Sequence, residues 1–425
     1  MSVPSRPDAP GRGAVVDGPF PRAQVWWLGS ALLGILLVMS AYEAFLPLLY
    51  LEHLDSRFLI GLLMSTDNVV GIVLIPLVGL WSDRLSHPLG QRLPFLIVGA
   101  PLAAAAFLAI PLAADVLWTL IAVEVLFTLA IHAYRSPAMS LMPDHVAPAQ
   151  RSRGSGIVNV MGGVGTLVTF AVLGPLFDVD RRWPFRVGAL VLLVTTAVVV
   201  WRADRRPPYA DMPDATRPRG RPAVGGALRT LRDPDHRGGV LALLSMLLFY
   251  VGSAGLVSLF PVYGVTVLGL SEGRAVTVLS AFIVAFVATT LLAGVVGVRF
   301  GKVRTMRGGL VVLAVLLTGA ASVRSMPALI GLLAVAGFAW SLAIVQALPL
   351  VADLGGRTSI GLLVGLYYLF TMLGQLLGTP FVGAAMDLLG DTAMFPAAAV
   401  PYVLAAAVLT RARRHLPAPE GLRAA

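Results

Sequence analysis

The chain has 425 residues, of which 57% are hydrophobic and only 13% carry a charge. Its mean hydropathy is +0.84. A water-soluble protein needs more charge than this to cover its surface, so the composition excludes a soluble globular protein and indicates a chain that crosses a membrane many times. There are no cysteines, which excludes disulfides and thiolate metal sites.

The order of apolar and polar segments predicts the architecture. Residues 1–23 are rich in Pro, Gly and Arg and are predicted to be a disordered cytoplasmic tail. Twelve apolar segments follow, each long enough at about 1.5 Å per residue to cross a hydrocarbon core of about 30 Å. They are 24–51, 58–81, 94–114, 116–140, 155–176, 184–201, 239–265, 273–298, 306–323, 326–350, 359–385 and 393–411.

A polar stretch at 202–237, rich in Arg, Pro and Gly, divides these segments six and six. The prediction is therefore an all-α integral membrane protein with two pseudo-symmetric six-helix bundles, 24–201 and 238–411. Residues 202–237 are the cytoplasmic linker between them, and residues 412–425 are a second cytoplasmic tail.

Basic residues indicate the orientation of the chain. With the N-terminus inside, 25 of the 32 Arg and Lys residues fall in cytoplasmic segments and 6 in extracytoplasmic turns. This asymmetry predicts a multi-pass cell-membrane protein with both termini in the cytoplasm. It also explains the net charge of +10 by topology, so we expect no nucleic-acid partner.

A short charged loop lies between the second and third apolar segments. It contains Gly79, Asp83, Arg84, Gly90 and Arg92. This spacing resembles the signature loop of the major facilitator superfamily. The longer Ser-Asp-Arg and Gly-x-Arg-x-Pro-Phe form resembles its sucrose-transporter and glycoside-pentoside-hexuronide cation-symporter branch, except that Leu93 stands where that branch has a second Arg.

The corresponding loop of the second half repeats part of this pattern. Gly294, Arg299 and Gly301 keep the Gly, Arg and Gly spacing, while Val298 replaces the acidic residue. Two similar bundles with equivalent loops are what transport by rocking of one half against the other requires.

Three further stretches resemble bacterial sucrose-transporter-like proteins: 135–165, 337–349 and 365–390. The resemblance implies a monomeric twelve-helix transporter for a sugar or glycoside, coupled to protons and embedded in lipid, with no cofactor. The glycines of 162–165 are expected to allow close helix contact.

The resemblance assigns the charged loop a gating role. It implies that Asp83 holds the interface between the halves in the outward-facing state. The alternative is that Arg84 and Arg92 only anchor the topology. Asp144 and Arg151 flank another cytoplasmic turn and are expected to pair with the 79–95 loop.

Ionisable residues inside the predicted helices of the first half are candidates for proton coupling. A charge at the bilayer centre costs about 2.5–3.5 kcal/mol on insertion scales, so such residues face a cavity or one another. Asp67, nearest the middle of its helix, is the preferred proton carrier. Glu43 and Glu124 compete with it, and Arg135 is a counter-charge to Asp67 or Asp144, or a substrate ligand. His132 lies three residues before Arg135; it could join a proton relay, but a core or interface role is favoured for it.

A sugar needs hydroxyl-matching polar groups and flat aromatic faces. The substrate-binding candidates of this kind are Asn68, Tyr250, Trp340, Gln346, Tyr367, Tyr368 and Gln375. Gln346 and Trp340 lead this set, because a mid-helix amide needs partners and because the resemblance places their helix at the cavity.

The favoured function is proton-coupled sugar or glycoside symport. A drug or metabolite exporter on the same fold is the first alternative, and a non-transporting receptor or scaffold is the second. No metal cluster, phosphate loop or catalytic set is visible in the sequence, which argues against an enzyme.

Overall fold

The computed structural model describes residues 19–205, 207–209, 237–323, 325–354 and 356–412. These residues form helices joined by short turns, and they contain no strand. The helices of the first half are α1 (Arg22–Leu51), α2 (Arg57–Met64), α3 (Thr66–Arg84), α4 (Leu93–Ala109), α5 (Leu117–His145), α6 (Arg151–Val168), α7 (Gly174–Val179) and α8 (Trp183–Arg202). Those of the second half are α10 (Arg237–Thr266), α11 (Glu272–Val278), α12 (Ser280–Phe300), α13 (Lys302–Ala320), α14 (Met326–Leu354), α15 (Gly356–Leu389) and α16 (Met394–Ala412).

These helices confirm the prediction of twelve membrane spans. Twelve stretches of the described chain are long and apolar enough to cross a membrane. The second span consists of α2 and α3, the eighth consists of α11 and α12, and the fifth joins α6 to α7 through a π-helical turn at Thr169–Leu173. The chain is therefore a multi-pass membrane protein.

The side chains of the spans divide according to what they contact. Large apolar residues such as Trp118 and Trp201 are exposed, as expected of side chains that lipid covers. Small residues lie between helices. At Gly165, the backbones of α6 and α1 approach so closely that a Cβ atom would overlap the Leu33 carbonyl. Close approach of this kind is typical of helices that associate in membranes.

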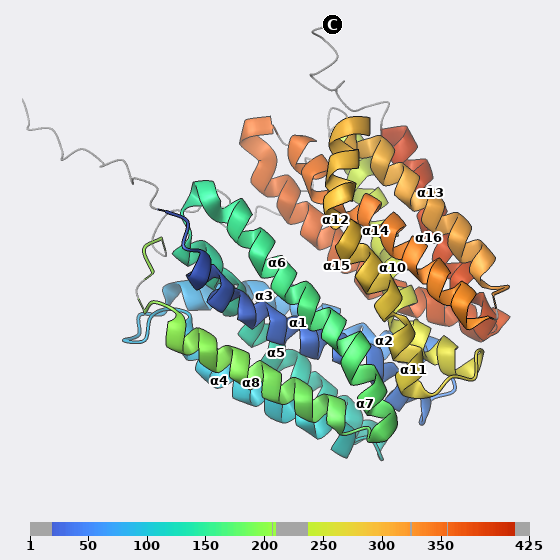
Figure 1. Cartoon of the computed structure of the whole chain (residues 1–425), viewed down its shortest axis with the longest axis horizontal. Helices are drawn as coiled ribbons and strands as arrows, with labels where there is room; N and C mark the ends of the chain where they lie inside the picture. The colour runs from blue at the N-terminus through green and yellow to red at the C-terminus, as the bar shows by residue number, and fades with distance from the viewer. Residues whose placement is uncertain (1–18, 206, 210–236, 324, 355, 413–425) are drawn as a thin grey trace, which may run out of the picture.

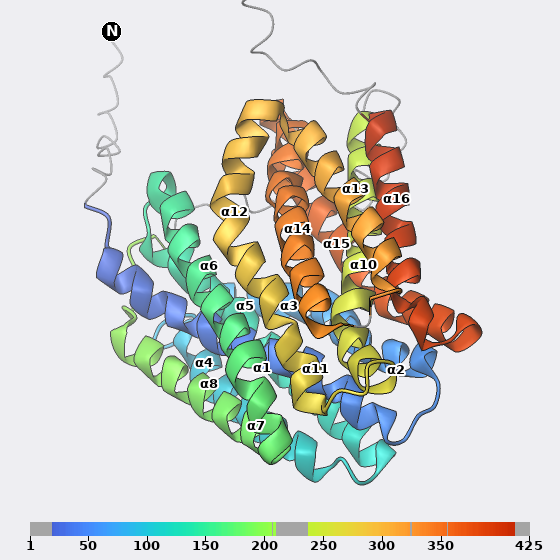
Figure 2. The ribbon, with the colours of Figure 1, turned by 45° about the vertical axis from the view of Figure 1, so that its right-hand side comes forward.

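Both the start of α1 and the end of α16 lie at one end of the molecule, here called the terminal end (Figure 1). The opposite end, called the far end, carries the turns before α2, α8 and α11. The two halves converge at the far end, where α2 packs on α15 and α7 on α11, and their ribbons diverge towards the terminal end (Figure 2). Most of the predicted linker at 202–237 and most of both predicted tails lie outside the described residues.

Candidate functional site

A buried carboxylate and imidazole form the centre of the polar cluster in the first half. Asp67 on α3 and His132 on α5 are both less than 10% exposed, and the distance from His132 Nε2 to Asp67 Oδ1 is 2.9 Å. Gly71, one turn after Asp67, faces the imidazole, and a Cβ atom there would lie 3.1 Å from His132 Cε1. The partner of Asp67 is therefore His132, and the interpretation of Arg135 as its counter-charge is not supported.

Two further charges of this cluster lie close to Asp67 without contacting it. Glu43 on α1 interacts electrostatically with Asp67 and with Arg135 on α5. Arg135 forms no ion pair with any residue that the structure describes, and its buried Nε lacks a hydrogen-bond partner there. Glu43 and Arg135 thus carry opposite charges and interact electrostatically without forming an ion pair in the described structure, and such groups can bind a hydroxylated ligand or water.

Glu124 occupies a separate and fully buried position on α5. It accepts hydrogen bonds from two tyrosines of α1, at 2.7 Å from the Tyr42 hydroxyl and also from the Tyr50 hydroxyl. Within the described part of the chain it has no cationic partner. The two tyrosines satisfy the carboxylate, so Glu124 joins α5 to α1 inside the bundle.

The second half offers aromatic rings and hydroxyl groups instead of charge. Trp340 on α14 packs against Phe249, Phe282 and Phe286 at ring-centroid distances of 5.6, 5.9 and 4.7 Å. Its Nε1 donates to Ser253 Oγ at 3.0 Å, and Ser253 contacts the Tyr402 hydroxyl at 2.8 Å. Trp340 is half-buried in this box.

The other aromatic candidates gather between α10 and α15. Tyr250 interacts with Tyr367 and Tyr368, whose rings pack edge to face at 5.3 Å. Tyr368 is 52% exposed and Tyr367 only 6% exposed. Gln375 on α15 and Asn68 on α3 are half-buried. These five residues supply hydroxyl, amide and aromatic groups without any charge.

The geometry of Gln346 argues against its prediction as a substrate-binding residue. Its Nε2 donates to the Ala293 carbonyl of α12 at 2.8 Å, and its carboxamide lies against Gly297. It is only 4% exposed. The expectation that a mid-helix amide needs a partner is correct, but the partner is the backbone of a neighbouring helix, so Gln346 holds α14 on α12 and does not contact the space between the halves.

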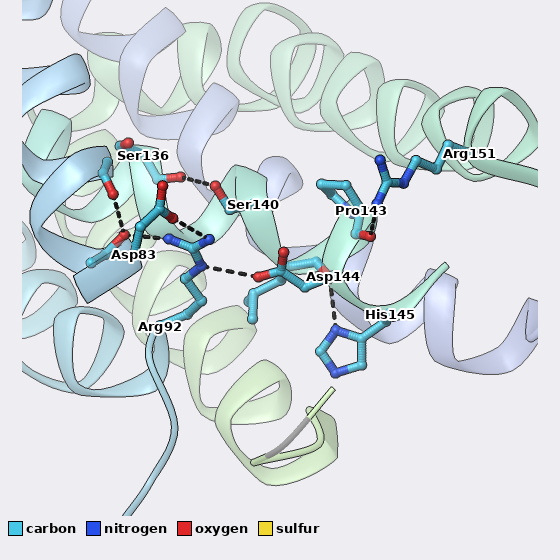
Figure 3. Close-up of polar contacts among 11 residues, drawn as sticks. Asp83, Arg92, Ser136, Ser140, Pro143, Asp144, His145 and Arg151 are labelled. Carbon is cyan, nitrogen blue, oxygen red and sulfur yellow. Dashed lines mark hydrogen bonds and ion pairs between the residues drawn. The ribbon is translucent and has the colours of Figure 1, made fainter. Parts of the chain in front are cut away.

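The charged loop of the first half forms an ion-pair network within its own bundle. Figure 3 shows Arg92 between Asp83 and Asp144. Arg92 is 3% exposed, and its nitrogens lie 2.6 Å from Asp83 Oδ1 and 3.0 Å from Asp144 Oδ2. It also donates to Ser82 Oγ. In this conformation Asp83 and Asp144 therefore share one arginine.

The remaining loop residues shape this region. Gly90 has a φ of +90°, a conformation that favours glycine, and it lies against the Arg205 carbonyl. Arg84 and Gly90 line a cavity of about 360 Å³ beside Arg92 and Asp144. Gly79 faces Ser136, and Arg151 donates to the Pro143 carbonyl at 3.0 Å.

In the equivalent loop of the second half, Gly301 has a φ of +86° between α12 and α13. Gly294 faces open space, and Arg299 lies over the Phe300 ring at 5.5 Å. The turn made by Gly301 corresponds to the turn made by Gly90, but no acid–arginine network is present among the described residues there.

The far end holds the polar contacts that close the two halves on one another. Asp387 of α15 accepts from Ser56 Oγ at 2.6 Å and from the backbone N–H groups of Arg57 and Phe58 at 2.6 and 3.0 Å. It thereby caps the N-terminus of α2 from the other half. Arg57 also pairs with Asp391 at 3.1 Å.

The same arrangement recurs between α7 and α11. Asp178 accepts from Ser271 Oγ at 2.6 Å and from the Gly273 N–H at 2.7 Å, and so caps α11. Arg181 pairs with Glu272 at 3.0 Å. We call these two sets of contacts the far-end gate. Among the residues described, the hydrogen bonds and ion pairs between the halves all belong to this gate or to Ser65, described below.

Sequence reasoning did not select the gate residues or Ser65. A signal was present, because a Ser precedes both the second and the eighth span and an Asp ends both the fifth and the eleventh. Comparing the two halves position by position would have found these pairs.

Twelve spanning helices in two bundles, closed at one end and holding polar groups between them, define a membrane transporter. The Major Facilitator Superfamily model matches residues 28–280 and 273–424, so the chain belongs to this superfamily.

Similar proteins agree with this assignment. The chain is 24% identical over 159 residues to the sucrose transport protein SUC3 of Arabidopsis thaliana, which is 32% of this chain and 26% of that protein. It is 30% identical over 168 residues to the class D tetracycline resistance protein of Salmonella ordonez, which is 39% of this chain and 40% of that protein. The chain thus spans less than half the length of either relative.

Among solved structures, a bacterial homologue of the lysosomal transporter Spinster, in an inward-facing and unoccupied conformation, aligns with a TM-score of 0.73 at 16% identity. The alignment covers 94% of this chain and 98% of that one. The nucleoside transporter NupG aligns with a TM-score of 0.73 at 11% identity, over 92% of this chain and 99% of that one. At these identities the likeness shows the fold alone.

Proposed function

We propose that this protein is a secondary active transporter that couples the movement of protons to that of a sugar or glycoside by alternating access. The observation that carries the proposal is the division of polar groups between the halves. The first half holds titratable groups at mid-membrane depth, and the second half holds uncharged aromatic and hydroxyl groups. The titratable groups of the first half can bind and release a proton, and the aromatic and hydroxyl groups of the second half can bind a neutral hydroxylated ring.

The proton step is assigned to Asp67. A carboxylate at this depth must face water, carry a proton or be paired, because hydrocarbon does not solvate its charge. Alternating access exposes such a group to the two aqueous sides in turn, and the desolvated state between them favours the protonated form. A proton bound on the acidic side then accompanies the occluded state and leaves on the other side.

The substrate step is assigned to Tyr250, Tyr367, Tyr368, Asn68 and Gln375. Their hydroxyl and amide groups match sugar hydroxyls, and tyrosine rings offer flat surfaces to sugar C–H faces. Arg135 and Glu43 are assigned to bind a pair of substrate hydroxyls from the first half. Trp340 supports this surface from its aromatic box, and the protein acts as a monomer.

The orientation follows from the charge asymmetry, with the terminal end in the cytoplasm. The conformation is then closed to the exterior, since the far-end gate is closed. Reporter fusions at Pro218 and at Asp391 test the topology. They should report cytoplasm and exterior respectively, and the same side for both would contradict it.

The decisive experiment uses the purified full chain in proteoliposomes with an imposed pH gradient. Radiolabelled sucrose and aryl glucosides are offered, and uptake is compared with that at equal pH. We expect accumulation that a protonophore abolishes. Asp67→Asn should retain exchange at equal concentrations and lose accumulation. Accumulation by Asp67→Asn would exclude Asp67 as the proton carrier.

A second candidate function is proton-driven export of a drug or metabolite. The 168-residue match to a tetracycline resistance protein favours it. The same proteoliposomes separate the two, because an exporter expels tetracycline against its gradient when protons enter, whereas a symporter moves its sugar with them.

A further inference from the structure

A single hydroxyl group connects the two halves near the proton site. Ser65 lies between α2 and α3, and its Oγ donates to the Leu376 carbonyl of α15 at 2.8 Å. The same Oγ lies 2.9 Å from the Gly61 carbonyl of its own helix. A hydroxyl has one proton, so these two acceptors compete for it.

The sequence of α15 explains why Leu376 is the better acceptor. Four residues after Leu376 stands Pro380, which has no N–H to donate to the Leu376 carbonyl. The Gly61 carbonyl, in contrast, already accepts from the Ser65 N–H at 3.1 Å. A carbonyl left without its own-helix donor inside a membrane is costly, and Ser65 satisfies it from the other half.

The backbones are held together at this point as well. Gly61 lies so close to α15 that a Cβ atom there would be 2.6 Å from the Thr379 carbonyl. Ser65 and Gly61 therefore rest on the same turn of α15, next to the far-end gate. Separation of the halves at the far end must break this contact.

Asp67 follows Ser65 by two residues, and its carboxylate is fixed by His132 at 2.9 Å. We propose that Ser65 is the positioning residue that links closure of the far-end gate to the Asp67–His132 pair. Asp67 is the proposed proton carrier, so the link rests on the proposed function for its role in transport. Gly71 leaves the room that the His132 ring needs when the pair is formed.

In this proposal, opening of the far end removes Leu376 from Ser65. The hydroxyl then turns fully to Gly61, and the turn that carries Asp67 is released from α15. Protonation of Asp67 weakens its bond to His132 and favours the released arrangement. The other titratable or charged groups that interact with Asp67, or with the groups around it, are Glu43 and Tyr42 on α1 and Glu124 and Arg135 on α5.

The test measures the gate directly and needs no substrate. Trp118→Cys and Leu388→Cys place spin labels on exposed far-end positions of the two halves in a chain that has no other cysteine. Loss of one hydrogen bond in Ser65→Ala should shift the ratio of open to closed far ends by about two- to tenfold. Thr371→Val is the control, because within the described part of the chain the Thr371 hydroxyl donates only to the Tyr368 carbonyl of its own helix.

A double-mutant cycle identifies the contact. Pro380→Ala gives the Leu376 carbonyl its own donor, so Ser65→Ala should add little in that background. Additive effects, or a Ser65→Ala distribution equal to that of Thr371→Val, would overturn the link.

Acidification completes the test. It should open the far end of the parent protein. The gate carboxylates Asp178, Glu272, Asp387 and Asp391 also lose their contacts when they are protonated, so Asp67→Asn should remove only the part of the response that these four groups do not supply. Ser65→Ala and His132→Leu should weaken the same part, whereas His132→Gln, which keeps a donor, should restore much of it. A parent protein without any pH response would also overturn the link. If these responses appear but Asp67→Asn still accumulates substrate in proteoliposomes, the proposed function fails while the link stands.

Discussion

The two halves share one architecture but differ in what they place at mid-membrane depth. Counting from the serines that begin the second and eighth spans, Asp67 and Phe282 occupy equivalent positions, 11 residues after Ser56 and Ser271. Asp67 contacts an imidazole, whereas Phe282 packs on Trp340. The same fold position is titratable in one half and apolar in the other. The pseudo-symmetry of the two halves therefore extends to the contacts of the far-end gate, but not to the side chains at mid-membrane depth.

The largest effect is expected when the apolar position of the second half, Phe282, is made acidic. Phe282→Asp places a carboxylate beside Trp340 with no imidazole to receive it. Insertion of a charge costs about 2.5–3.5 kcal/mol, and the lost ring leaves a cavity. We expect a strong loss of thermal stability of the purified protein, by at least about 3 kcal/mol. Phe282→Leu, the apolar control, should lose much less, and equal losses would show that charge is not the cause.

A smaller effect is expected at Glu124, where the first half buries an acid without a cation. Glu124→Ala leaves the Tyr42 and Tyr50 hydroxyls without their acceptor. Each unsatisfied buried group costs about 1–3 kcal/mol, so for two hydroxyls we expect a loss of at least about 2 kcal/mol in the stability of the protein. Glu124→Gln should recover part of it. An unchanged melting temperature for Glu124→Ala would mean that other groups accept these hydrogen bonds.

The proposed substrate-binding role of the second half can be tested by removing one tyrosine hydroxyl group. Tyr250→Phe should raise the KM for sugar about two- to tenfold, which corresponds to the loss of one hydrogen bond. The coupling of transport to the pH gradient should be unchanged. Tyr402→Phe is the matched control, because the Tyr402 hydroxyl is buried on Ser253 within its own bundle. It should lower stability and leave the KM unchanged. A raised KM in both variants would argue against a direct contact of Tyr250 with substrate.

The smallest effect is expected at the charged loop of the first half. In the present conformation Asp83 contacts Arg92 of its own bundle, and the proposed latch between the halves belongs to the state in which the terminal end is closed. Asp83→Asn removes the Arg92 contact of the present conformation and also the proposed latch of the other conformation. If the latch is the stronger of the two, the population shifts towards the present conformation, by a few-fold, since such ion pairs contribute about 1 kcal/mol or less. Labelling of single cysteines at the two ends measures the shift. Equal labelling of parent and variant would leave Asp83 as a topological anchor.

The spans were predictable because hydropathy and length alone define them. The polar contacts were less predictable, for reasons that particular residues illustrate. The amide of Gln346 needs a hydrogen-bond partner because it lies in the middle of a helix, but the sequence does not show whether that partner is a substrate or the Ala293 carbonyl. The spacing of His132 and Arg135 places both on α5, yet only the rotation of α5 against α3 decides which of them meets Asp67. Ser65 gains its significance from Pro380, more than 300 residues away, and no local pattern connects them.

The ion pairs of the far-end gate have a consequence for assembly. Both arginines, Arg57 and Arg181, belong to the first half, and both acids, Asp391 and Glu272, belong to the second. These two ion pairs therefore favour association of a first half with a second half, although Arg181 also pairs with Glu52 of its own half. Partly exposed pairs of this kind are also screened by salt. The ionic strength on the far-end side of the membrane thus acts on the stability of the closed gate, although no ion needs to bind there.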